Sequence, residues 1–107
     1  MSKTRNYSEQ TKAIMQRCFQ AVDTLIADGV LKSNYQYCNT HGIDRRHFAA
    51  QKKDPEKGYF EVSWLVPLVS LYGISSDWLL TGRGQMSKRH AILSLVYSTP
   101  QTASSRL

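Results

Sequence analysis

The stretch of sequence that decides the fold is SNYQYCNTHGIDRRHFAAQKK, residues 33–53. Ser33 followed three positions later by Gln36 is a capping box, in which each side chain satisfies a free backbone donor at the start of a helix. Gly42 is able to adopt the left-handed conformation that ends a helix, and Asp44 is a favoured N-cap for the next one. The stretch therefore predicts two short helices joined by a very tight turn.

Apolar and small residues at set positions fix the angle between these two helices. Ile43 and Phe48 flank the cap at the spacing of a hydrophobic staple, which sets the direction in which the helix over residues 44–53 leaves the turn. Cys38 is small at the point where the helices approach most closely. Two helices joined in this way cross steeply, so the pattern favours a helix-turn-helix motif, with an ordinary helical hairpin as the alternative.

Upstream, the residues from Ser8 to Asp28 have the periodicity of one long amphipathic helix. Gly29 follows as a stop signal. The apolar positions recur every three or four residues and are Ile14, Met15, Cys18, Phe19, Val22, Leu25 and Ile26. They predict the apolar face of a first helix.

Downstream, turn-forming residues alternate with apolar runs. Asp54–Gly58 contains both Pro and Gly and predicts an exposed loop that closes the preceding helix. Ser63–Tyr72 is apolar nearly all round, which predicts a helix buried on most sides. Pro67 is then expected in the first turn of this helix, where a missing N–H costs little, and Gly73 stops the helix.

A last short helix is predicted over Ser76–Thr81, with Ser75 as its N-cap and Gly82 as its end. Its apolar residues are expected to fold back on the core, and they are Trp78, Leu79 and Leu80. Together the segments predict an all-α fold, a compact five-helix domain over residues 1–86.

Residues 87–107 are predicted to be a C-terminal extension, partly helical and then flexible. Its apolar residues Ile92, Leu93, Leu95 and Val96 have no evident partner within five compact helices. We therefore expect a homodimer that forms through the last core helix or through Lys88–Tyr97. Packing of this segment within its own chain is the alternative.

The charge balance points to a polyanionic partner. Fourteen Lys and Arg against eight Asp and Glu give a formal net charge of +6, with basic clusters in Met1–Arg17 and Arg45–Lys57.

Two cysteines and no leader of the signal-peptide kind favour a cytoplasmic location without disulfides. The longest apolar run, Trp64–Val69, is too short to span a membrane, so nucleic acid is a better candidate than a membrane.

Two stretches of the chain, Ser33–Arg45 and Trp64–Gly84, resemble the lambda-repressor-like, or Cro-type, helix-turn-helix domains of phage repressors and bacterial regulators. The resemblance implies a five-helix DNA-binding domain whose third helix enters the major groove, commonly as a homodimer on a partly palindromic operator. Cys38 and His41 depart from the family, which has Ala and an aliphatic residue at these places, and the loop Asp54–Phe60 is longer and more charged than usual.

We therefore expect a sequence-specific regulator of transcription, a repressor, that binds double-stranded DNA. Taking Phe48 as pointing inward, helical geometry turns Arg46, Ala50 and Lys53 most nearly outward. The residues predicted to contact bases are Arg46, Ala49, Ala50, Lys53 and Arg45. The residues predicted to contact phosphates are Asn34, Tyr35, His47, Lys52, Lys57 and Arg17.

Enzymatic and metal-binding functions are disfavoured. Cys38, His41 and His47 could be taken for metal ligands, but no further ligand completes a tetrahedral set at a familiar spacing. No nucleophile with a base and no paired carboxylates are evident, so we predict neither catalysis nor a cofactor.

Two other binding functions stay open. Tyr35, Tyr59 and Phe60 are the aromatic residues that could stack on single-stranded nucleic acid. The more serious alternative is a helix-turn-helix domain that acts as a protein adaptor or an antitoxin-like partner. The cations of the third helix favour DNA over both.

Overall fold

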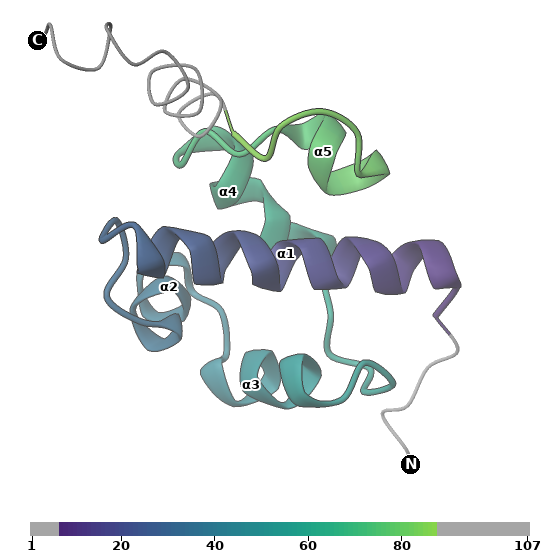
Figure 1. The fold of residues 1–107 in the computed structure, drawn as a ribbon. Coiled ribbons are helices and arrows are strands. Elements are labelled where there is room, and N and C mark those ends of the chain that lie inside the picture. The colour runs from purple at the N-terminus through teal and green to yellow at the C-terminus, as the bar shows by residue number, and fades with distance from the viewer. Residues whose placement is uncertain (1–6, 88–107) are drawn as a thin grey trace, which may run out of the picture.

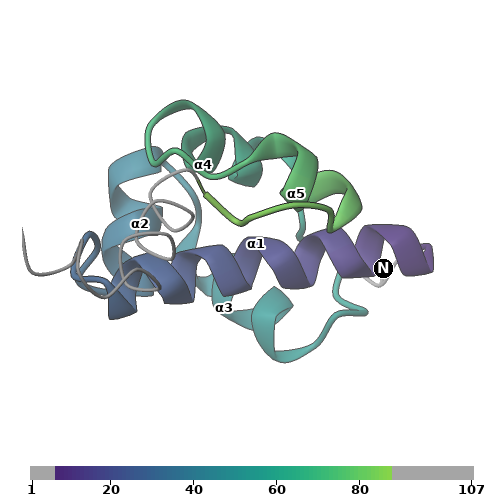
Figure 2. The ribbon, with the colours of Figure 1, turned by 45° about the horizontal axis from the view of Figure 1, so that its top comes forward.

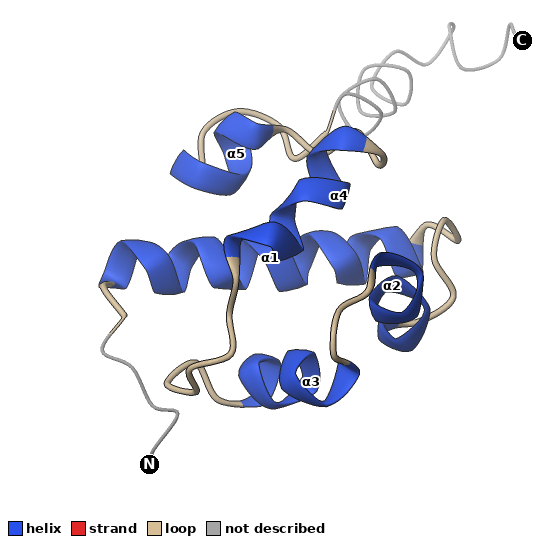
Figure 3. Cartoon of the chain, turned by 180° about the vertical axis from the view of Figure 1, so that it is seen from behind, coloured by secondary structure: helices blue, strands red, loops and turns tan. Residues whose placement is uncertain are grey.

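Helix α1, Glu9–Ala27, runs through the middle of the molecule in the computed structural model, which describes residues 7–87 (Figure 1). The other elements are α2 (Asn34–His41), α3 (Arg45–Lys53), the 3-10 helix η1 (Val62–Leu65), α4 (Val66–Ser70) and α5 (Ser76–Thr81). Helices α2 and α3 lie on one side of α1 in Figure 1, and α4 and α5 lie on the other. Figure 2 shows α3 and the pair of α4 and α5 on opposite sides of α1 from a second direction. Figure 3 shows only helices and loops over the described residues, so the predicted all-α fold is confirmed.

The limits of α1 are those that the sequence predicts. The Ser8 hydroxyl accepts a hydrogen bond from the Thr11 backbone N–H at 3.0 Å, and the helix ends one residue before Asp28. Six of its side chains are buried because helices cover it on two sides: Met15, Cys18, Phe19, Ala21, Val22 and Leu25. Through these contacts α1 joins the two layers of the fold into one core.

The caps of α2 and α3 also follow the sequence. The Ser33 hydroxyl accepts from the Gln36 backbone N–H, and Gly42 ends α2 with a φ of +69°. Gln36 departs from the expected capping box, since its side-chain oxygen accepts from the backbone N–H of Lys32 at 2.6 Å and not from that of Ser33. Gln36 therefore holds the backbone before α2 at Lys32, one residue earlier than the predicted contact at Ser33. The Asp44 carboxylate caps α3 by accepting from two backbone N–H groups.

Aromatic side chains fill the space where α1, α2, α3 and η1 meet. The rings of Phe19 and Trp64 each have their centroids 5.1 Å from that of Phe48. The Tyr37 hydroxyl donates to the backbone carbonyl of Trp64 at 2.7 Å, which ties α2 to η1. Burial raises the pKa of Tyr37 far above its ordinary value, so this hydroxyl remains a donor. The angle between α2 and α3 is set by this packed core.

The prediction of one continuous helix over Ser63–Tyr72 is wrong. The chain forms η1 and then the short α4, because Pro67 has no N–H to donate and the Val66 N–H bonds to Ser63, three residues back. The expected burial on most sides is also wrong. The exposed fractions are 57% for Val66, 40% for Val69 and 68% for Leu71. A short helix at the edge of the fold has too few neighbours to cover an apolar surface all round.

Helix α5 has the predicted limits and caps. Ser75 accepts from the Trp78 backbone N–H, and Gly82 ends the helix in the left-handed conformation. Trp78 and Leu79 are buried as expected, whereas Leu80 is 53% exposed. The prediction that all three side chains fold back on the core therefore fails for Leu80.

Gln51 is a buried polar residue that the sequence analysis did not single out. Its side-chain oxygen accepts from the backbone N–H groups of Tyr59 and Phe60, at 2.8 and 3.1 Å. Its amide nitrogen lies 3.0 Å from the Pro55 carbonyl oxygen and 3.1 Å from the Met15 sulfur. One amide therefore holds the loop after α3 and sets the rotation of α3 against α1.

The described part of the chain ends beside α5. The Ser75 N–H donates to the Met86 carbonyl at 2.7 Å, and Ile74 forms an isolated bridge with Ser87. The predicted partly helical extension and the Lys88–Tyr97 segment predicted to pair two copies lie outside the described residues. Within residues 7–87, no helix has the length and apolar character needed to cross a bilayer.

We predict that Gln51→Met destabilises the protein by about 2–4 kcal/mol, because two backbone donors and a carbonyl lose their buried partner while the side-chain volume is nearly kept. Urea unfolding followed by circular dichroism measures the change. Gln20→Met, at an exposed position of α1, is the matched control and should unfold close to the wild type. An unchanged unfolding midpoint for Gln51→Met would contradict the role of this amide.

Asp44 gives the fold a pH-dependent element. The His47 and Arg46 backbone N–H groups bond to its carboxylate and hold its pKa below the ordinary value. Because the folded pKa is lowered, the stabilisation is present above the unfolded pKa of about 4 and is lost as the pH falls through the folded pKa. Asp44→Asn keeps the cap and removes the charge, so the variant should melt below the wild type at pH 7. This difference should shrink by pH 3, and a constant difference would refute the assignment.

Candidate nucleic-acid interface

The exposed side of α3 carries most of the residues predicted to read bases. Arg45, Arg46, Ala49 and Lys53 are exposed, whereas Ala50 is half-buried. Both Phe48 and Gln51 point inward. The inward direction is now the mean of the Phe48 and Gln51 directions and not that of Phe48 alone. At about 100° per residue, this change turns the outward direction by about 30° from Ala50 toward Ala49. The outward direction therefore falls between Arg46 and Lys53, and Ala49, the more exposed of the two alanines, lies beside them.

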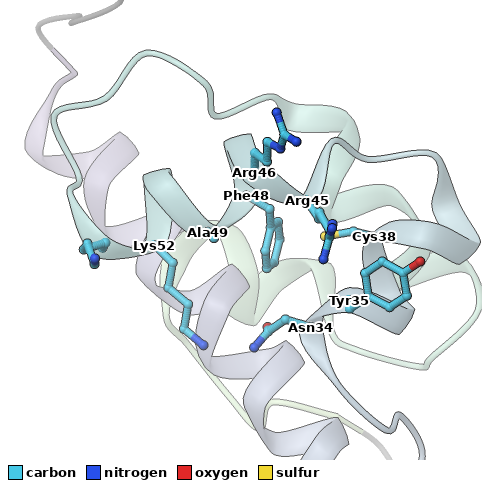
Figure 4. Close-up of a pocket in the computed structure, with 9 residues that line it drawn as sticks. Asn34, Tyr35, Cys38, Arg45, Arg46, Phe48, Ala49 and Lys52 are labelled. Carbon is cyan, nitrogen blue, oxygen red and sulfur yellow. The ribbon is translucent and has the colours of Figure 1, made fainter.

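A groove of about 450 Å³ opens between α2 and α3 beside this face. It is lined by two residues from the start of α2 and by the cationic side of α3, over a floor that includes Cys38 and Phe48 (Figure 4). The residues of its rim are Asn34, Tyr35, Arg45, Arg46, Ala49, Lys52 and Lys53. The structure therefore brings together most of the predicted contact residues around one surface.

Arg45 and Tyr35 connect the two helices of the motif. The Arg45 guanidinium carbon lies 4.9 Å from the centre of the Tyr35 ring, which is a cation–π distance (Figure 4). Arg46 points away from this pair (Figure 4). The pairing is not evident from the sequence because the two residues are ten positions apart and meet only through the turn. The contact with Tyr35 holds Arg45 over α2, whereas Arg46 is directed outward.

Lys52 and Asn34 face each other across the groove, near α1 (Figure 4). The Lys52 ammonium lies 2.7 Å from an Asp23 carboxylate oxygen of α1. The side-chain oxygen of Asn34 is buried and has no hydrogen-bond partner among the described residues. The amide nitrogen of Asn34 points into the groove (Figure 4), where it is a suitable donor to a phosphate oxygen.

His47 is held at the other side of α3 by a ring stack. Its imidazole lies parallel to the Tyr59 ring, with centroids 4.0 Å apart and an angle of 3° between the planes. Tyr59 is positioned in turn by Gln51, which accepts from its backbone N–H. Phe60 packs edge-on against Trp64. Tyr59 and Phe60 are half-buried in these contacts and do not form a free stacking platform.

Arg17 does not lie on this surface. Its guanidinium donates to the backbone carbonyls of Leu79 and Leu80, at 2.8 and 3.2 Å, and so satisfies the C-terminal end of α5. Helix α5 lies on the opposite side of α1 from α3 (Figure 1). Arg17 is therefore not brought together with the other predicted phosphate contacts. Lys57 is exposed in the loop after α3, which a Lys12–Glu56 ion pair fastens to α1.

The cations at the centre of the interface are not neutralised by side chains in the described part of the chain. Within residues 7–87, no salt bridge engages Arg45, Arg46 or Lys53. Lys52 shares its charge with Asp23 and is half-buried. The exposed face of α3 thus presents positive charge beside the small side chain of Ala49, an arrangement that attracts a polyanion.

The cysteine and histidine residues weighed as metal ligands or nucleophiles are engaged in packing. Burial raises the pKa of Cys18 to about 12 and that of Cys38 to about 11, which makes both thiols poor nucleophiles near neutral pH. His41 lies 2.9 Å from the Tyr72 hydroxyl through its Nε2 atom. No group of three His, Cys, Asp or Glu side chains within residues 7–87 is placed to hold a metal ion.

Comparison with protein families, curated proteins and solved structures finds no match to this chain. The inference of function therefore rests on its own residues.

Proposed function

We propose that this chain binds double-stranded DNA in a sequence-specific manner, with α3 in the major groove, and represses transcription by occupying its site. The observation that carries the proposal is the exposed face of α3, where Arg46 and Lys53 point outward beside Ala49 and no carboxylate pairs with either cation within the described residues. The major groove is about 12 Å wide and admits an α-helix of this kind.

Each part of the interface has a distinct role in this proposal. Arg46 lies in the first turn of α3, and its planar fork matches the two acceptors of a guanine. Ala49 and Ala50 let the backbone approach and offer methyl groups to thymine, with Ala49 the more exposed of the two. Lys53 and Arg45 complete the set of base contacts, with Arg45 held at the α2 side by its contact with Tyr35.

Phosphate contacts are assigned to the residues around the groove and loop. These residues are Asn34, Tyr35, His47, Lys52 and Lys57, of which Asn34 and Tyr35 lie in the first turn of α2. Helix N-termini favour anionic groups because their free N–H groups point outward. Such contacts position the protein on DNA without reading sequence.

The resemblance to lambda-repressor-like domains supports the same arrangement and extends it. In that family the third helix enters the major groove and two copies commonly bind a partly palindromic operator. We therefore propose that two copies of this chain bind together to one DNA site. The order and caps of the five helices are compatible with such a domain.

A protein adaptor is the second candidate function, and one observation favours it. Val62, Val66, Val69 and Leu80 are exposed and line an apolar groove on the side of α1 that faces away from α3. The two candidates differ in one respect: an adaptor binds neither specific nor bulk duplex.

We predict that binding to duplex DNA weakens steeply with salt. Contacts with about 6–8 phosphates by two copies give a log–log slope of about −5 to −7. Fluorescence anisotropy with a labelled duplex selected from a random pool, measured at several salt concentrations, gives this slope and the sequence preference together. Absence of binding at low salt, or a slope near zero, would overturn the proposal in favour of an adaptor.

We predict that Arg46→Ala costs about 1–3 kcal/mol of binding free energy on the selected duplex and relaxes the preference at one base pair. Arg83→Ala removes the same charge from the exposed segment after α5 and is the matched control. Its effect should be small and equal on all duplexes. Lys52→Ala should weaken all duplexes alike, since it removes a phosphate contact.

If Arg46→Ala keeps both the affinity and the base preference of the wild type, the base-reading role of this residue is wrong. If it instead lowers the affinity for every duplex by the same factor, Arg46 contacts phosphate and another residue of the face reads the bases.

A further inference from the structure

The apolar groove formed by η1, α4 and α5 has a volume of about 290 Å³. Its side chains come from each of these elements, and the apolar ones are Val62, Leu65, Val66, Val69, Leu79 and Leu80. Four of them are exposed, with 57% for Val66 and 53% for Leu80. An apolar surface of this kind in contact with water is a site where further burial lowers the free energy.

The chain that follows the described residues starts next to this groove. Met86 accepts from the Ser75 N–H, and Ser87 is bridged to Ile74. Ser76, the neighbour of Ser75, itself lines the groove. Whatever follows Ser87 therefore leaves the core at the end of α5 that borders the groove.

The sequence after Ser87 is suited to an apolar surface. Residues 91–97 have the sequence AILSLVY, in which Ser94 alone is not apolar, and they follow the basic triplet 88–90. Four residues from Ser87 to Ala91 span up to about 13 Å when extended, more than the length of about 7.5 Å of a five-residue helix such as α4. The segment is therefore able to reach along the groove of its own chain.

We propose that residues 91–97 dock in the groove of η1, α4 and α5 of the same chain. A second copy of the chain would compete for the groove only at its bulk concentration, whereas a short tether holds the chain's own segment at an effective concentration in the millimolar range. At micromolar concentration the intrachain contact therefore prevails. The inference does not rest on DNA binding. Two copies on DNA then meet through a surface other than this groove.

Hydrogen–deuterium exchange of the full chain tests the docking. The backbone amides of residues 91–97 should exchange more slowly than those of a free peptide with the same sequence, to the same extent at 20 μM and at 2 μM protein. Val66→Asp places a charge in the groove and should bring the exchange of residues 91–97 to the free-peptide rate. Val30→Asp, at an exposed apolar position in the loop after α1, is the matched control and should retain the protection.

Leu95→Lys keeps the test decisive if Val66→Asp does not fold, because residue 95 lies outside the described core. This variant should lose the protection of residues 91–97 while melting as a folded protein. Free-peptide exchange in the wild type overturns the proposal, as does protection that both variants leave unchanged. Protection that disappears on tenfold dilution also overturns it, because the groove is then covered by a second copy.

Discussion

The buried amide of Gln51 is the contact on which the geometry of the interface depends. It satisfies two backbone donors and one carbonyl of the loop after α3, and it lies against Met15 of α1. A buried polar group left without partners costs free energy, so the four contacts favour one rotation of α3 over its neighbours. Because Gln51 and Phe48 both point inward, Arg46, Ala49 and Lys53 point outward.

Helix α1 separates two surfaces of different character. On one side, α2 and α3 present cations and the starts of two helices, and on the other, η1, α4 and α5 present aliphatic side chains. Two side chains of α1 reach polar groups in these layers, since Asp23 pairs with Lys52 of α3 and Arg17 bonds to the last carbonyls of α5. The apolar face of α1 packs in the core between them. A single long helix thus fixes the charged surface and the apolar surface relative to each other.

Much of the fold follows from local signals in the sequence. Ser33, Asp44 and Ser75 cap three helices as predicted, because capping depends on residues only two or three positions away. The prediction of one continuous helix in place of η1 and α4 was wrong, and so was the predicted burial of Leu80. Burial of a helix face depends on which elements pack against it. The apolar sequence of Ser63–Tyr72 does not show that few elements do so.

The candidate site shows the same limit. The inward direction of Phe48 alone predicted the direction of the exposed face of α3 to within about 30°. The remaining error came from Gln51, which also points inward because its partners lie in the loop and in α1. Arg17 was grouped with the phosphate contacts on its charge, but the carbonyls of α5 that engage it lie 62 and 63 residues away in the chain. The contacts of Arg45 with Tyr35 and of His47 with Tyr59 also form between separate segments. A single sequence without its fold does not show these pairings.

The short length of α3 explains why so many separate contacts hold it. A nine-residue helix is marginal by itself in water, and α3 buries only Phe48 and Gln51. A larger buried face would stabilise it more, but it would remove side chains from the surface that is available to a ligand. Instead, α3 is fixed by the Asp44 cap at its start, by Gln51 in the middle and by the Lys52–Asp23 ion pair near its end. Helix α3 is thereby held in one position while most of its surface stays free, as the proposed insertion of α3 into the major groove requires.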